Sequence, residues 1–185
     1  MSNEQVVLQQ YLEFCASPLR TEQSIKDEYQ QLLRNPDVTH VAFHKPHILM
    51  VGTKMIVIHD DDKDYEIGEF IIFLTRKRIE RVWETSFNFT NYTHPINRPN
   101  KKGEPEDVAM HPHIVWWSSE IESEIEAKAG DLCIANGQMP IYQALRKGYI
   151  NTAVAHLIVV LQTYCERPYL SVDHWPQVTK ELDND

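Results

Sequence analysis

Apolar residues recur at helical spacing near the start of the chain. Between residues 4 and 16 they return every three or four positions, which predicts a helix with one buried face, made of Val7, Leu8, Tyr11, Leu12, Phe14 and Cys15. A second stripe predicts a helix that ends near Arg34, with Ile25, Tyr29, Leu32 and Leu33 on its buried side. We expect Ser17 to cap this second helix and Pro18 to lie in its first turn.

Residues 38–90 change to the alternating pattern that is typical of strands. Four segments carry it: Val38 to His44, Ile48 to Ile58, Tyr65 to Leu74, and Val82 to Phe89. Gly52 is expected to mark a bulge or a bend within the second segment. Because the links between the segments are short, the pattern predicts an antiparallel meander of three or four strands.

Two charged runs flank the third of these segments. The acidic run 60–64 resembles the start of a calcium loop, but Tyr65 stands where that loop needs glycine and Ile71 where it needs glutamate. A solvated hairpin tip is therefore the preferred interpretation. The basic run 76–78 is expected to be an exposed strand end rather than a nucleic-acid patch.

The second half of the chain returns to helical spacing after an irregular stretch. Residues 91–110 are rich in proline, asparagine and lysine, which predicts a long surface loop. A helix is expected from Pro140 to Lys147, and Asn151 can cap another over residues 152–165, in which His156 is expected in the core or at its boundary. Helices, a meander and then more helices indicate an α+β fold with the helices segregated from an antiparallel sheet.

Chain length, charge and cysteine content restrict the classes of protein to which this chain can belong. A chain of 185 residues predicts one domain, and a formal charge of −9 argues against binding to a phosphate backbone. There is no apolar run of about 18 residues and no signal-peptide pattern, so we expect no membrane span. The three cysteines are Cys15, Cys133 and Cys165. They lie far apart in sequence and do not form a disulfide framework, which favours a reducing, cytoplasmic compartment.

Candidate chemistry is concentrated in residues 111–137. His111-Pro112-His113 precedes Cys133, which lies where strand-rich sequence gives way to helix-rich sequence. A thiol near an imidazole in such a place is a plausible nucleophile. Two alternatives stay open: a buried, inert thiol, and a zinc site formed by the two histidines with Cys133. The zinc-deaminase pattern is incomplete, since its glutamate and second cysteine are missing. Cys15 and Cys165 are interpreted as packing residues.

The order of these segments resembles that of the ubiquitin-conjugating (UBC) enzymes. Those enzymes have a helix, then a four-stranded meander, a His-Pro-Asn type motif, a loop cysteine and further helices. The residues that carry the resemblance are His111-Pro112-His113-Ile114 and Gly130-Asp131-Leu132-Cys133, followed by Gly137, Gly148, Tyr164, Pro168-Tyr169 and Trp175. The chain resembles prokaryotic and phage-borne relatives of that fold, in which, as the resemblance implies, the third motif residue is often histidine. It departs from the eukaryotic pattern in His113 and in the longer spacing to Cys133.

The resemblance implies a UBC-like domain over residues 19–176, preceded by a helical extension (1–18) and followed by an acidic tail (177–185). Cys133 would accept the C-terminus of a ubiquitin-like modifier from an activating enzyme and pass it to an amine of a target protein. The segment 19–34 would serve partner docking. The implied chemistry needs no cofactor and no metal.

The same resemblance implies roles for the neighbouring residues. His113 would either donate a hydrogen bond to the developing oxyanion or hold the loop. His111 and Pro112 would stiffen the turn. Asn136 would substitute for the asparagine amide that the motif lacks at position 113. Asp131 and Asp173 are candidate bases by charge alone. Two other functions remain: a catalytically silent UBC-fold module that binds a ubiquitin-like protein or scaffolds a complex, and a zinc-dependent hydrolase.

Overall fold

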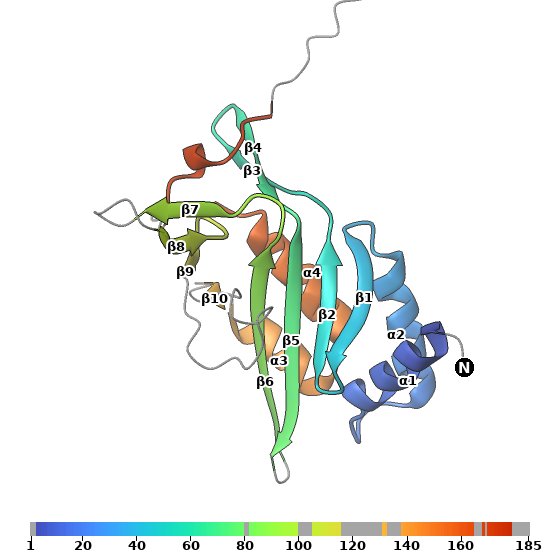
Figure 1. The fold of residues 1–185 in the computed structure, drawn as a ribbon. Helices are drawn as coiled ribbons and strands as arrows, with labels where there is room; N and C mark the ends of the chain where they lie inside the picture. The colour runs from blue at the N-terminus through green and yellow to red at the C-terminus, as the bar shows by residue number, and fades with distance from the viewer. Residues whose placement is uncertain are drawn as a thin grey trace, which may run out of the picture.

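The computed structural model describes residues 3–79, 82–99, 105–115, 131–132, 138–164, 168 and 170–178. It is an α+β fold, as predicted, with a four-stranded antiparallel sheet and helices at both ends of the chain (Figure 1). The helices are α1 (Asn3–Cys15), α2 (Glu22–Arg34), α3 (Gln138–Lys147), α4 (Ile150–Leu161) and the 3₁₀ turn η3 (Val172–His174).

The four-stranded sheet has the order β1-β2-β5-β6. Its strands are β1 (Val38–Lys45), β2 (Ile48–Thr53), β5 (Phe70–Ile79) and β6 (Val82–Asn91). Three smaller antiparallel pairs accompany it: β3 (Ile56–Asp60) with β4 (Lys63–Gly68), β7 (Ile96–Pro99) with β8 (Pro105–Ala109), and β9 (Ile114–Val115) with β10 (Asp131–Leu132). The sheet is therefore a meander into which the β3–β4 hairpin is inserted.

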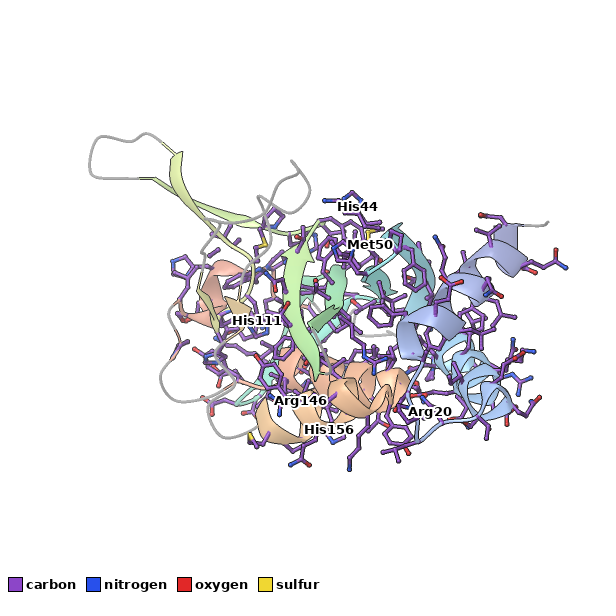
Figure 2. All side chains as sticks on the ribbon, turned by 90° about the horizontal axis from the view of Figure 1, so that it is seen from below. Arg20, His44, Met50, His111, Arg146 and His156 are labelled. Atoms are coloured by element: carbon purple, nitrogen blue, oxygen red, sulfur yellow. The ribbon has the colours of Figure 1, made fainter. Side chains whose placement is uncertain are left out.

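One face of the sheet forms the core. The register aligns apolar side chains in two rows across the strands, Phe43–Leu49–Leu74–Phe87 and Val41–Val51–Ile72–Phe89. These rows pack with the buried sides of α3 and α4, which cover this face (Figure 1). The other face carries a smaller apolar cluster of Ile48, Met50, Ile71 and Phe73. Figure 2 shows Met50 and His44 on the side of the sheet opposite to Arg146 and His156.

The strands differ from the sequence prediction in four places. The expected strand Ile48 to Ile58 is broken after Thr53, and the expected strand Tyr65 to Leu74 is broken at Gly68. Gly68 has φ +141°, and a Cβ there would lie 2.3 Å from the Asn91 amide, so only glycine fits this bend. The irregularity expected at Gly52 lies instead on β1, between Val38 and His40. Part of the expected loop 91–110 forms the β7–β8 hairpin.

The helices also differ from the sequence prediction in their caps and in the burial of individual residues. Thr21, not Ser17, caps α2, and its hydroxyl accepts the Ser24 N–H at 3.2 Å. Leu33 is 45 % exposed, because the buried side of α2 includes Glu28 instead. Asn151 lies inside the first turn of α4 and does not cap it. His156 is exposed and its Nδ1 bonds the Thr152 carbonyl at 2.7 Å, so its expected place in the core or at the core boundary was wrong.

The N-terminal helix shares the single large core with the sheet. Its residues Tyr11, Phe14 and Cys15 are buried in the same cluster as the strands and the C-terminal helices. In the part of the chain that the structure describes, none of the helices has the length and apolar character needed to cross a bilayer.

Candidate functional site

The His111–His113 turn directly follows β8 and is anchored by a buried amide. Asn91, at the end of β6, donates from Nδ2 to the Met110 carbonyl at 2.9 Å and to the Ile67 carbonyl at 2.7 Å. Its Oδ1 accepts the His94 N–H at 2.9 Å. Because a buried amide that loses a partner is costly, this network fixes where the chain enters the turn.

The imidazole of His111 is fully engaged by backbone groups. It is 1 % exposed; Nε2 lies 2.7 Å from the Leu161 carbonyl at the end of α4, and Nδ1 accepts the His113 N–H at 3.1 Å. These partners define a neutral tautomer with the hydrogen on Nε2. Burial lowers the pKa of His111 to about 3, so the ring stays neutral at physiological pH. These contacts fit the supporting role that the resemblance implies for His111.

The imidazole of His113 lies beside two other rings. It is 7 % exposed, and its centroid is 5.9 Å from that of His111 and 5.7 Å from that of Tyr164. Burial lowers the pKa of His113, which favours the neutral ring. A neutral imidazole carries one N–H and one nitrogen with a lone pair, so it is able to donate one hydrogen bond and accept another.

The segment 170–178 closes over the turn and continues to the β3–β4 hairpin. The Leu170 N–H donates to the Pro112 carbonyl at 3.4 Å. Further along, Asp173 accepts the Tyr65 hydroxyl at 2.8 Å, and Trp175 donates from Nε1 to the His94 carbonyl at 3.0 Å. The turn is therefore held between the end of α4 and the C-terminal segment.

The short β9–β10 pair bears directly on the spacing between the motif and Cys133. Ile114, which follows His113, pairs with Leu132, which precedes Cys133; Val115 pairs with Asp131. The two ends of the long intervening segment are thus neighbours in space. Cys133 and Asn136 themselves lie outside the described residues, as does Cys165.

The two candidate bases are placed differently. Asp173 is exposed, and the hydroxyls of Tyr65 and Ser171 lower the pKa of its carboxyl group. A carboxylate with a lowered pKa accepts a proton less readily, which makes Asp173 a weaker candidate. For Asp131 the structure describes the backbone pairing in β10.

The hydrogen bonds of His111 argue against the alternative prediction of a zinc site. Both of its ring nitrogens already have backbone partners, and a ligating histidine needs one nitrogen free for the metal. Among the described residues no cluster of three histidine, cysteine or acidic side chains is able to hold a metal ion. Cys15 is buried, and burial raises the pKa of its thiol to about 12, so it is an inert packing residue, as predicted.

Sequence reasoning missed three buried charged residues that join the helices. Arg20 pairs with Glu28 and donates to the Gly148 carbonyl, and its guanidinium lies 4.7 Å above the Tyr149 ring. Arg76, in the basic run expected at the surface, is 2 % exposed and donates to backbone carbonyls of α1 and α3, those of Phe14 and Arg146. Nothing in the local pattern distinguishes these charges from exposed ones.

No protein-family model, curated protein or solved structure matches this chain. Its function is therefore inferred from the residues and contacts described above.

Proposed function

We propose that this protein is a ubiquitin-conjugating-like acyltransferase of a bacterial or phage conjugation system, with Cys133 as its nucleophile. The observation that carries the proposal is the pairing of Ile114 with Leu132. It brings the residue before Cys133 beside the residue after His113, although the two lie far apart in sequence. The α+β order, with the sheet before the turn and helices after it, supports the same assignment.

The proposed reaction has two acyl transfers. The Cys133 thiolate attacks the thioester carbonyl between the modifier and its activating enzyme; a new C–S bond forms, and the activating enzyme's thiolate leaves. An amine of the target then attacks the Cys133 thioester and loses a proton to a base, and the Cys133 thiolate leaves as the amide forms. Thiols suit both steps because the thiolate is a good nucleophile and a good leaving group.

His113 has two possible roles in this mechanism. An N–H donor aimed at the oxyanion of each tetrahedral intermediate contributes about a hundred- to a thousand-fold in rate. The burial of His113 and its contact with Tyr164 favour the other role, in which the imidazole supports the loop. Both roles require that the imidazole of His113 be held in a fixed position.

The second candidate is a catalytically silent module that binds a ubiquitin-like protein. The burial of both motif imidazoles favours it, because buried rings suit a turn that serves only as structure. The zinc hydrolase is third, since His111 would have to give up a backbone partner to bind a metal.

The test mixes the protein with ATP and a panel of ubiquitin-like proteins, each with its own active activating enzyme. We expect one of them to form an adduct on Cys133 that is released by dithiothreitol, is absent in Cys133→Ala and is thiol-resistant in Cys133→Ser. Cys15→Ala, matched in chemistry but buried, should retain the adduct. Binding of a modifier without an adduct would instead support the silent module, and stoichiometric zinc by elemental analysis the hydrolase.

A further inference from the structure

We infer that the C-terminal segment 170–178 forms a strap that holds the His111–His113 turn in place and opens as a unit. The hydrogen bond between Tyr65 and Asp173 is its latch: when this bond is lost, the strap opens more often and the turn loosens. The inference rests on the proposed function, because the turn belongs to the site of that function. Figure 1 shows the end of the strap, in red, beside the β3–β4 hairpin.

The end of the strap adds a strand to the β3–β4 hairpin. The Glu66 N–H donates to the Pro176 carbonyl at 2.9 Å, and the Val178 N–H donates to a second carbonyl of β4 at 2.8 Å. Between these two bonds, Gln177 forms an antiparallel bridge with Tyr65. The strap is therefore fixed to the edge of the hairpin by its backbone.

The latch joins the strap to the same residue of β4. Tyr65 is 4 % exposed, and its hydroxyl donates to Oδ1 of Asp173 at 2.8 Å. Ser171 donates to the other carboxylate oxygen at 3.0 Å. The bond between them raises the pKa of Tyr65 to about 12 and lowers the pKa of Asp173. The phenol therefore stays a donor, and the carboxylate an acceptor, throughout the physiological pH range.

A chain of hydrogen bonds runs from the strap to the residue that enters the turn. Trp175, which is 3 % exposed, donates from Nε1 to the His94 carbonyl at 3.0 Å. The His94 N–H donates to Oδ1 of Asn91 at 2.9 Å. From Nδ2, Asn91 donates in turn to the Met110 carbonyl at 2.9 Å. The position of Trp175 therefore bears on the start of the turn.

The strap also contacts the turn directly at its other end. The Leu170 N–H donates to the Pro112 carbonyl at 3.4 Å. Asp173 lies between Leu170 and Trp175 in the sequence, so the latch lies between the two contacts that bear on the turn. Short segments of this kind open locally as cooperative units. Loss of the latch should therefore loosen both contacts together.

The experiment uses Tyr65→Phe, which keeps the ring and removes the donor of the latch. Tyr92→Phe is the matched control, because the Tyr92 hydroxyl also donates to a carboxylate, that of Glu69 at 2.7 Å, and neither residue belongs to the strap. Asp173→Ala removes the latch from its other side. Amide hydrogen exchange, followed by mass spectrometry, measures the opening of the strap and of the turn in the protein alone.

In Tyr65→Phe we expect the amides of the strap and of residues 110–115 to exchange about tenfold faster, since a hydrogen bond to a charged group is lost. The amides of β2 and β5 should keep their wild-type protection, which separates local opening from a loss of global stability. Asp173→Ala should have the same effect, and the double variant should add nothing, because both changes remove one bond. Tyr92→Phe should leave the exchange of both segments unchanged.

The consequence for activity is measured in Tyr65→Phe alone, because Asp173 is itself a candidate base. We expect the rate of modifier transfer from Cys133 to fall by about threefold or more, since a loosened turn spends less time in the reactive geometry. In Tyr92→Phe the rate should equal that of the wild type.

The inference and the proposed function fail differently. Unchanged exchange in both Tyr65→Phe and Asp173→Ala overturns the latch, whatever the activity, and additive effects in the double variant do the same. Faster exchange of the strap alone overturns its role in holding the turn, and equally faster exchange in β2 and β5 overturns the local opening. A loosened turn in a protein that forms no adduct with any active upstream enzyme overturns the proposed function and leaves the strap as a structural device.

Discussion

The carboxylate of Glu28 on α2 accepts the backbone N–H of Asn151, in the first turn of α4, at 3.0 Å. The residue before that helix, Tyr149, makes no side-chain cap of its own, so a distant helix supplies the acceptor. A negative charge at a helix N-terminus is favourable, and Arg20 balances it by pairing with the same carboxylate. Burial nevertheless raises the pKa of Glu28, so the arrangement depends on its partners staying in place.

Removing this carboxylate should destabilise the whole fold. We expect Glu28→Ala to lower the free energy of unfolding by about 3–5 kcal/mol, since it leaves Arg20 buried without its partner. Glu28→Gln should cost less, because the amide oxygen still accepts the Asn151 N–H. Urea unfolding at pH 7 measures both. Glu22→Gln, which breaks the exposed pair with Lys26 on the same helix, should leave the midpoint unchanged; an equal effect of the two would refute this assignment.

The cap of α2 gives a direct comparison between a predicted and an observed residue. Thr21→Ala should cost about 1 kcal/mol, because it removes the acceptor for the Ser24 N–H. Ser17→Ala should cost a few tenths of a kcal/mol at most, since the Ser17 hydroxyl accepts only the Leu19 N–H at 3.4 Å, outside the helix. Thermal or urea unfolding ranks the two variants, and a larger loss in Ser17→Ala would show that α2 begins earlier.

Two glycines in crowded places should respond differently to alanine. Gly148 has φ +76°, and a Cβ there would lie 2.7 Å from the Cys15 carbonyl oxygen, a backbone atom. We expect Gly148→Ala to cost about 2 kcal/mol or more, from left-handed strain and the clash with α1. Gly52→Ala should cost less, because its new neighbours are the exposed side chains of His40 and Thr39, which can move away, and not backbone atoms. The difference between their unfolding free energies is the measurement.

The buried His111 should make the protein sensitive to mild acid. Its folded pKa of about 3 lies below the ordinary 6.5, so the folded state binds this proton less readily than the unfolded state does. The stability that the neutral ring contributes is complete above pH 6.5 and is lost as the pH falls toward 3. Over that window the loss is about 1.4 kcal/mol per pH unit.

His111→Gln should flatten this slope of unfolding free energy against pH by about one proton, even though the variant is less stable at pH 7. The wild type, measured under the same conditions, is the reference. Urea unfolding from pH 4 to pH 7 distinguishes the two. A slope that His111→Gln does not change would mean that another group carries the acid sensitivity.

The helices and strands of this fold could be predicted from the local sequence pattern, because each element depends mainly on residues close to one another in sequence. The stripes of α2 and the alternation of β5 are set by the geometry of one segment, so they predicted the α+β class and the positions of the main helices. The motif His111-Pro112-His113 and the candidate nucleophile Cys133 were visible for the same reason. The boundaries at Gly68 and Thr21 were missed, because several residues nearby had similar local preferences.

Only the tertiary structure decided how distant residues meet. It buried Arg20, Glu28 and Arg76. Backbone carbonyls accept hydrogen bonds from the two guanidinium groups, and the Asn151 N–H and the Arg20 guanidinium donate to the Glu28 carboxylate, so these charges are stable there. It also paired Ile114 with Leu132 and enclosed His113 between the turn and Tyr164. Such contacts depend on chain segments folding onto one another, and a one-dimensional pattern does not record which segments those are.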